Sequence, residues 1–213
     1  MKKVLIIILS LFLLFSCKNK ESKIEIENFY PIKEVDKVLP KIDKRSSEIQ
    51  KILEKAEEYK NPLTYDEAEI IYESVQNEIK NYSWLYSALV YSIIEKESQY
   101  KKSAFNDKNK NNSVDYSYMQ INEISRIDYN NHHKEKITSE QLMNDTTLNI
   151  KVGCWILNRK RESLIRNEIE PTEENIIKAY NCGEHKVIGD CVPQSTIEYQ
   201  RKISEKIPFY ILG

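Results

Sequence analysis

Apolar residues recur at helical spacing over most of this chain, and that spacing predicts a mainly helical protein. The first such pattern runs from Ser46 or Ser47 to about Tyr59, where apolar side chains return every three or four positions. Asn61 and Pro62 follow, and the residue before a proline avoids helical backbone angles. We therefore expect an amphipathic helix that ends shortly before this pair.

Two more helices are predicted in the middle of the chain. Thr64 and Glu67 have the spacing of a capping box, so they should open a helix that continues to about Lys80. Ser83 is then expected to cap an apolar helix over residues 84–100. Its residues Tyr86, Val90, Ile93 and Ile94 fall on one apolar stripe.

Further helical patterns follow in the second half of the chain. They are expected at Ser139–Met143, at Asn149 to about Glu162, at Glu173 to about Asn181 behind the cap Thr172, and from Ser195 or Thr196 to about Lys206. Before them lies a polar stretch, residues 103–122, that carries too many large side chains for a free linker. We predict a loop or small hairpin there, lining a groove.

The beginning of the chain is predicted to be a targeting segment. Lys2 and Lys3 precede the apolar run Val4–Phe15, which is too short to span a membrane comfortably. The run ends in Leu-Phe-Ser-Cys, the pattern of a bacterial lipoprotein signal, so cleavage would leave Cys17 to carry a lipid. An ordinary secretory signal is the other interpretation. Either one exports the chain, and lipidation would anchor it to a bacterial membrane, facing the periplasm or cell wall.

Composition then suggests four segments. Residues 1–17 form the signal and its lipidation site, and residues 18–45, rich in Lys and Glu, form a predicted tether. Residues 46–82 are expected to be accessory helices, and residues 83–213 the main domain. About 197 residues remain without the signal, which is enough for one sizeable domain with an appendage.

The charge balance excludes some classes of partner. The chain has 32 basic and 33 acidic residues, and without Lys2 and Lys3 the count is 30 to 33, a net charge of −3. Such a balance lacks the positive surplus of nucleic-acid-binding proteins. It also gives no general attraction to an anionic membrane, so any anchoring must come from a lipid on Cys17.

Cysteine and histidine usage suggests a disulfide and no metal site. An exported chain can form disulfides, and Cys182 and Cys191 bracket a short loop, so we favour that pair, although sequence alone leaves the pairing open. Cys154 lies in a helical pattern and is expected to be a buried thiol. The doublet His132-His133 has no third ligand nearby and is interpreted as surface loop residues. We expect no metal and no cofactor.

Glu97 has the clearest chemical implication. At 3.6 residues per turn it falls on the same face as the apolar residues Val90 and Ile94, whereas Glu95 falls about half a turn away, on the opposite side. A carboxyl group in apolar surroundings near a helix C-terminus resists ionisation. A carboxyl that stays protonated near neutral pH can serve as a general acid. The alternative is a glutamate at a fraying helix end that turns into solvent.

Short motifs follow Glu97 over roughly 120 residues. They are Glu97-Ser98-Gln99-Tyr100, Ala104-Phe105-Asn106, Asp115-Tyr116-Ser117-Tyr118-Met119-Gln120-Ile121-Asn122, Asn149-Ile150-Lys151-Val152-Gly153-Cys154-Trp155-Ile156-Leu157, Ala179-Tyr180-Asn181-Cys182-Gly183 and Thr196-Ile197-Glu198-Tyr199. In type and order they resemble the lytic transglycosylase (SLT, lysozyme-like) domain family, in particular the branch found with secretion systems and pili. The resemblance covers about Trp84 to Ile207. Ser117 and Tyr118 stand where that family has Gly and Leu, and a serine at positive φ would carry strain.

The resemblance implies a lysozyme-like α domain with an N-terminal helical extension and a lipid tether. It also implies cleavage of the β-1,4 bond between N-acetylmuramic acid and N-acetylglucosamine in peptidoglycan, with Glu97 as the single general acid and base and a 1,6-anhydro product. Other motif residues are expected to bind the glycan strand or to position Glu97, although Met119 and Tyr180 also suit core packing, and Tyr199 is expected to be structural. The expected substrate-binding residues are Tyr118, Met119, Gln120, Asn122, Tyr180 and Asn181.

Two other functions stay open at this stage. Asp115 lies in a stretch that is also similar to the loop of animal-type lysozymes, so a muramidase using Glu97 and Asp115 is possible, unless Asp115 only forms a turn. The replacements at Ser117 and Tyr118 suggest instead a non-catalytic lipoprotein that binds peptidoglycan. The branch resemblance also raises a secretion or pilus assembly as a possible partner.

Overall fold

The computed structural model describes residues 43–108 and 113–212, and it confirms a mainly helical fold. The predicted signal, the lipidation site Cys17 and nearly all of the predicted tether lie outside these residues. The helices are α1 (Lys44–Glu58), α2 (Tyr65–Ile79), α3 (Ser87–Ser98), α4 (Glu123–His133), α5 (Ser139–Asn144), α6 (Thr146–Arg166), α7 (Glu173–Cys182), α8 (Glu184–Ile188) and α9 (Gln194–Ile211). In the part that the structure describes, none of these helices has the length and apolar character needed to cross a membrane.

Local signals account for several helix ends. The predicted capping box is present, because Thr64 Oγ1 accepts from the Glu67 amide and the Glu67 carboxylate accepts from the Thr64 amide. Thr172 caps α7 as predicted. The predicted cap Ser83 is wrong: α3 begins at Ser87, because residues 83–86 turn to bring Trp84 against α6, where its indole donates to Asn158 at 3.0 Å.

The sequence patterns did not predict α4 or α8, and they predicted the wrong ends for α9. The α4 helix buries only Tyr129, so its apolar pattern is weak, and its last turn contains His132 and His133, which are therefore not loop residues. The His133 ring stacks on Tyr129 with centroids 4.3 Å apart. The α9 helix begins after Pro193 rather than at Ser195 or Thr196, and it continues beyond Lys206 to Ile211.

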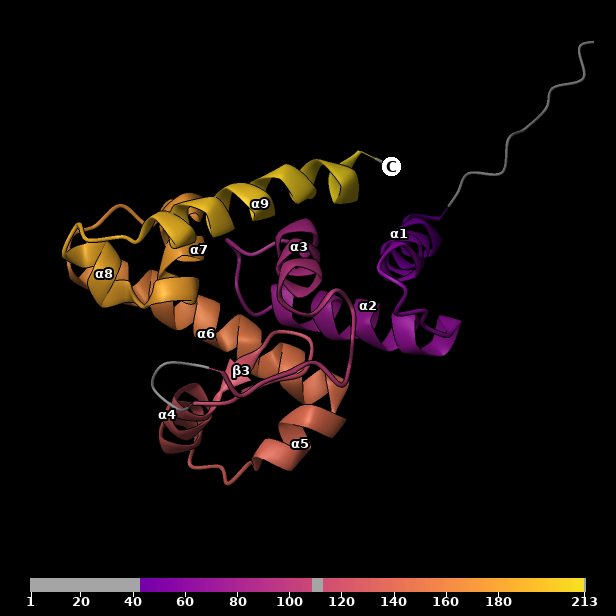
Figure 1. The fold of residues 1–213 in the computed structure, drawn as a ribbon, viewed down its shortest axis with the longest axis horizontal. Coiled ribbons are helices and arrows are strands. Elements are labelled where there is room, and N and C mark those ends of the chain that lie inside the picture. The colour runs from indigo at the N-terminus through magenta and orange to yellow at the C-terminus, as the bar shows by residue number, and fades with distance from the viewer. Residues whose placement is uncertain (1–42, 109–112, 213) are drawn as a thin grey trace, which may run out of the picture. The chain divides into compact units, whose positions relative to one another are not determined.

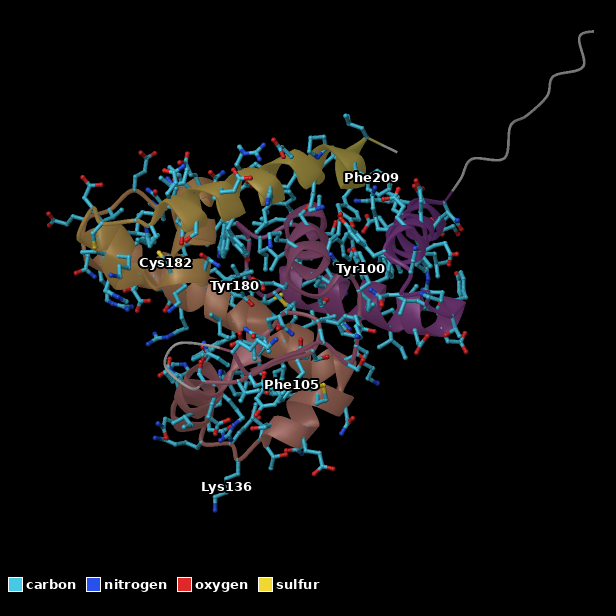
Figure 2. All side chains as sticks on the ribbon, viewed as in Figure 1. Tyr100, Phe105, Lys136, Tyr180, Cys182 and Phe209 are labelled. Atoms are coloured by element: carbon cyan, nitrogen blue, oxygen red, sulfur yellow. The ribbon has the colours of Figure 1, made fainter. Side chains whose placement is uncertain are left out.

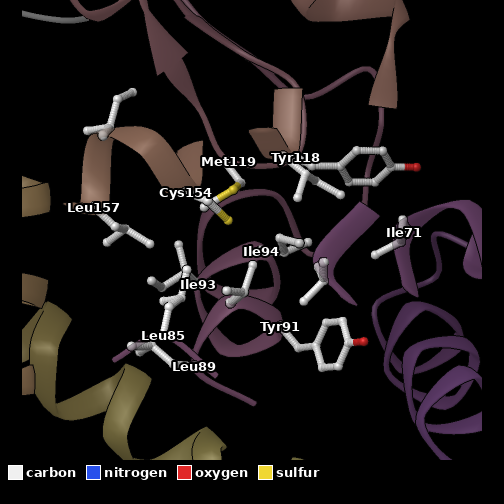
Figure 3. Close-up of a cluster of buried hydrophobic side chains, with 14 of the residues drawn as sticks. Ile71, Leu85, Leu89, Tyr91, Ile93, Ile94, Tyr118, Met119, Cys154 and Leu157 are labelled. Atoms are coloured by element: carbon white, nitrogen blue, oxygen red, sulfur yellow. The ribbon is translucent and has the colours of Figure 1, made fainter. Parts of the chain in front are cut away.

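The core is organised around α3. This helix lies between α9 and α2, and its most extensive contacts are with α9, while α2 packs along α6 (Figure 1). Every residue from Ala88 to Glu95 is buried, so α3 is enclosed on all sides. Ile93 and Ile94 belong to the same buried cluster as Met119 and Cys154 (Figure 3). Because its sides are covered, α3 reaches the surface mainly near its C-terminal end.

The predicted small hairpin is present as part of a three-stranded antiparallel sheet. Its strands β1 (Phe105–Asn106), β2 (Asp115–Tyr116) and β3 (Ile121–Asn122) pair in chain order. The buried Asn149 of α6 fastens the β2–β3 turn, because its Oδ1 accepts from the Met119 amide at 2.9 Å and its Nδ2 donates to the Tyr116 carbonyl at 3.0 Å. Gly153 permits this approach, since a Cβ there would meet Met119 Sδ at 2.2 Å.

Ser117 in the β2–β3 turn has the strained backbone that the sequence suggested. Its φ is 60°, its side chain is buried, and its Oγ has no hydrogen-bond partner within the described residues. A left-handed backbone costs an L-residue about 1–2 kcal/mol, and a buried unpaired hydroxyl costs a further ~1 kcal/mol or more.

We therefore predict that Ser117→Gly stabilises the fold by about 1 kcal/mol, after allowing for the greater freedom of glycine in the unfolded chain. Urea unfolding measures the change. Lys60→Gly is the matched control, because Lys60 has φ 59° but is exposed, so only the backbone contribution should appear. A stabilisation of Ser117→Gly no larger than that of Lys60→Gly would mean that the buried hydroxyl has no cost, and a loss of stability in Ser117→Gly would contradict the predicted strain.

Candidate active site

Glu97 occupies the last turn of α3, and the local backbone fixes where that turn ends. Gln99 and Tyr100 both adopt left-handed angles, with φ 54° and 60°, so the chain leaves the helix sharply after Ser98. The Tyr100 ring is buried, and its hydroxyl lies 2.8 Å from that of Tyr210 on α9. This contact holds the end of α3 against α9, so the backbone position of Glu97 is fixed.

The Glu97 carboxyl group is half-buried and hydrogen-bonded. Tyr199 of α9 donates from its hydroxyl to Glu97 Oε1. Burial raises the pKa of Glu97 to about 7, and the nearby Asp115 also raises it, while Tyr199 and Lys96 act in the opposite direction. This arrangement favours the general-acid interpretation over a glutamate that turns freely into solvent.

Two tyrosines of the motifs have side-chain contacts that bear on their predicted roles. Tyr199 was expected to be more structural than catalytic, and its hydroxyl donates to Glu97, while Lys96 Nζ lies 5.1 Å from the centre of its ring. Tyr180 follows the core-packing alternative, because its hydroxyl donates to the Met119 carbonyl at 2.8 Å. Burial raises the pKa of Tyr180, and the negative charge of Glu97 adds to this effect.

Glu95, which the helical stripe placed on the side of α3 opposite Glu97, is almost completely buried. Its carboxylate accepts from the hydroxyl of Tyr59 on α1 at 2.8 Å, from that of Tyr210 on α9 at 2.8 Å, and from Lys206. The stripe could not show this, because α3 is enclosed on every side and has no solvent face along most of its length. The two glutamates differ because Glu95 is paired with Lys206, whereas Glu97 has no ion pair among the residues that the structure describes.

Four of the predicted substrate-binding residues meet at one pocket. This groove pocket has a volume of about 200 Å³ and lies between the β3–α4 segment and α7. Gln120, Asn122, Tyr180 and Asn181 all line it, together with residues such as Lys160, which the sequence reading missed. Lys160 forms an ion pair with Glu184 at 2.6 Å, which links α6 to α8. No local sequence motif predicts this contact.

The other two predicted substrate-binding residues lie in the core, which corrects their assignment. Tyr118 and Met119 are fully buried, and Figure 3 shows Tyr118 inside the buried cluster on the side of Ile71. The left-handed Ser117 turns the following side chains inward, and the space at Gly153 receives Met119. Neither side chain faces a groove in this structure.

The polar residues of the groove pocket are held by local hydrogen bonds. Gln120 Nε2 donates to the Ser117 carbonyl at 2.8 Å, and Asn122 Oδ1 caps α4 by accepting from the Ser125 amide at 2.8 Å. Asn181 Oδ1 accepts from the hydroxyl of Thr196 at 2.7 Å, which links α7 to α9. These bonds orient the polar groups before any ligand arrives.

Asp115 lies in a strand rather than in a turn. It pairs with Asn106 on one side and Asn122 on the other in the sheet register, and Asn106 Nδ2 donates to its carboxylate at 2.9 Å. Burial is the main cause of the raised pKa of Glu97, and the charge of Asp115 adds to it. Glu97 is nevertheless bonded to Tyr199, which is the tighter contact.

The predicted disulfide is not formed in the structure. Cys182 and Cys191 are both free thiols, because Cys182 ends α7 half-buried beside Thr196, whereas Cys191 lies exposed beyond α8. Gly183, with φ 86°, lets the chain turn directly from α7 into α8 (Figure 2 labels Cys182 at this corner). Cys154 is a buried thiol, as predicted. No group of His, Cys, Asp or Glu within the described ranges has the arrangement of a metal site.

Comparison with known proteins identifies the motif-bearing part of the chain. The model of the transglycosylase SLT domain family matches residues 74–196. Among solved structures, the chain resembles an inactive glutamate-to-glutamine mutant of the lytic transglycosylase Slt from Pseudomonas aeruginosa, with a TM-score of 0.52 and 14% identity. The match covers 78% of this chain but only 30% of that one, so this chain spans less than a third of that protein. No curated protein matches the sequence.

The raised pKa of Glu97 predicts that this residue destabilises the fold at high pH. The unfolded chain ionises near 4.5 and the folded chain near 7, so stability is lost as the pH rises between these values. We expect Glu97→Gln to be more stable than the wild type by about 2 kcal/mol at pH 8, after discounting partial exposure, and equal to it at pH 4.

Urea unfolding at both pH values measures this difference. Glu54→Gln, an exposed position on α1, is the control and should show no such pH dependence. Equal stabilities of wild type and Glu97→Gln at pH 8 would mean that Glu97 ionises normally.

Proposed function

The chain belongs to the transglycosylase SLT domain family, and on that premise we propose that it is a peptidoglycan lytic transglycosylase whose catalytic residue is Glu97. The observation that carries the proposal is the half-buried Glu97 carboxyl, which accepts a hydrogen bond from Tyr199 and whose pKa burial raises to about 7. The resembling Pseudomonas protein is an inactive glutamate-to-glutamine mutant, which is in keeping with an essential glutamate in such a domain.

In the first step Glu97 acts as the acid. Its proton passes to the oxygen of the β-1,4 bond between N-acetylmuramic acid and N-acetylglucosamine, and that oxygen takes the electron pair of the breaking bond. The muramic acid ring gains oxocarbenium character. A carboxyl with a pKa of about 7 is well matched to this task, because a large fraction is protonated at neutral pH and the proton is still readily released.

In the second step the Glu97 carboxylate acts as the base. It takes the proton of the substrate's own 6-hydroxyl, whose oxygen attacks the anomeric carbon and closes a 1,6-anhydro ring, so no water is consumed. An internal nucleophile removes the entropy cost of recruiting one. Between the steps, the Tyr199 hydroxyl donates to the carboxylate and stabilises it, which makes Tyr199 a positioning residue.

The groove pocket is the proposed binding site for part of the glycan strand. Gln120, Asn122 and Asn181 offer amide groups for hydroxyl and acetamido groups, and Tyr180 supplies an apolar ring face. Within the described residues, the local hydrogen bonds use the amide nitrogen of Gln120 and the amide oxygens of Asn122 and Asn181, so the other half of each amide can bond a ligand.

Asp115 motivates the second candidate, a muramidase. Its carboxylate raises the pKa of Glu97, as a second catalytic carboxylate across a cleft would. The bond from Asn106 gives it a structural role as well, which favours the single-carboxyl route. A purely binding protein is the weaker alternative, because it leaves the raised pKa of Glu97 without a use.

We also propose the surroundings in which the enzyme works. The apolar run and Cys17 suggest a lipid-anchored protein of the periplasm or cell wall, tethered by the residues that precede α1. The resemblance to the secretion- and pilus-associated branch leaves such an assembly as a possible partner.

Digestion of purified peptidoglycan tests the proposed reaction. We expect 1,6-anhydro muropeptides, identified by mass spectrometry and by their resistance to borohydride reduction. Glu97→Gln should lower the rate by about 10³-fold, because it removes both the acid and the base, whereas the exposed control Glu54→Gln should retain it.

Asp115→Asn separates the two catalytic candidates. The single-carboxyl route predicts less than about a tenfold loss and unchanged anhydro products. Reducible products that disappear in Asp115→Asn would identify a muramidase instead. Binding of glycan strands without any cleavage by the wild type would leave only the non-catalytic alternative.

A further inference from the structure

A second pocket beside α3 is separate from the groove pocket. It has a volume of about 500 Å³ and is lined by residues of α1, α3 and α9; we name it the α1–α9 pocket. Its lining includes Lys55 and Tyr59 of α1, Lys96 of α3, and Lys202 and Lys206 of α9. Lys96 Nζ lies 5.1 Å from the centre of the Tyr199 ring, and the Tyr199 hydroxyl bonds Glu97, so one lining residue contacts the side chain that holds the proposed catalytic carboxyl.

Most of this pocket lies outside the part of the chain that the family shares. The family model spans residues 74–196, so the α1 lining precedes it and the α9 lining follows it. Only Glu95, Lys96 and Gln99 of this lining lie within the matched residues.

The pocket has a surplus of positive charge. Four lysines and two glutamates line it, and both glutamates are already paired: Glu95 with Lys206, and Glu205 with Arg201. Lys55 is also paired, with Glu58 at 2.8 Å.

Two lysines remain without a strong partner. Lys202 is 3.5 Å from Glu198, which also bonds Arg201. In the described part of the chain Lys96 has no ion pair and lies over the Tyr199 ring. These two ammonium groups come from facing helices and suit an anion between them.

We propose that the α1–α9 pocket binds a carboxylate-bearing peptide, the stem peptide attached to the glycan strand cleaved at Glu97. The inference rests on the proposed function, since peptidoglycan carries short acidic peptides on its muramic acid units. A volume of about 500 Å³ suits a ligand of peptide size rather than a single phosphate or carboxylate. The rings of Tyr59 and Phe209 provide apolar surface for the aliphatic parts of such a peptide.

A binding experiment tests this inference without any turnover. The full chain bearing Glu97→Gln is titrated calorimetrically with the free tetrapeptide alanyl-γ-glutamyl-diaminopimelyl-alanine. Lys202→Glu should weaken binding at least tenfold, because it places a negative charge where the carboxylate is held. Lys136→Glu is the control of equal charge change, since Lys136 is exposed on the side of the molecule away from Phe209 (Figure 2).

Further probes identify what is bound. The same peptide with its carboxyl groups amidated should not bind, and inorganic phosphate should not displace the acidic peptide at equal concentration. Equal affinity for phosphate would reduce the pocket to a small-anion site and overturn the inference, as would unchanged binding in Lys202→Glu. Lys202→Gln and circular dichroism spectra show whether any loss reflects unfolding, and a folded Lys202→Gln with wild-type affinity would also count against the proposal.

Turnover then separates this inference from the proposed function. The wild type should cleave peptide-bearing strands more efficiently than strands stripped of peptides, and Lys202→Glu should abolish that preference while leaving cleavage of stripped strands unchanged. Cleavage without a preference would overturn the peptide site and leave the enzyme proposal standing. Peptide binding without any cleavage would do the reverse.

Discussion

The proposed active site depends on one contact, the hydrogen bond from Tyr199 of α9 to the half-buried Glu97 at the end of α3. Burial makes the charged carboxylate costly, and the tyrosine hydroxyl offsets part of that cost. The balance leaves a carboxyl group that holds or releases a proton near neutral pH. Both halves of the proposed reaction need this balance, because the same group must first give a proton and then take one.

The surrounding fold keeps that contact in place. Glu95, two residues before Glu97, is bound by Lys206, Tyr59 and Tyr210, so contacts from α1 and α9 fix the last turns of α3. On the opposite side, Asn149 fixes the β2–β3 turn that carries the groove residues. Hydrogen bonds at Glu95 and at Asn149 therefore fix the segments around the site. They also offset the loss of folding stability that the buried Glu97 causes at high pH.

The sequence predicted what depends on local or periodic signals. Thr64 and Thr172 mark helix starts by bonds to residues three positions away, and Glu97 was found from the apolar stripe and its motif. Contacts between distant residues escaped prediction. Tyr199 is 102 residues from Glu97, the partners of Glu95 lie on α1 and α9 far along the chain, and Tyr118 was predicted to bind substrate although it lies in the core.

The most direct test of this account is the ionisation of Glu97 itself, followed by NMR of ¹³C-labelled glutamate carboxyl groups, with Glu97→Gln used to assign the signal. The account predicts a pKa of about 7 in the wild type and a higher value in Tyr199→Phe, where the stabilising hydrogen bond is lost. A Glu97 signal that titrates near 4.5 and is unaffected by Tyr199→Phe would contradict it.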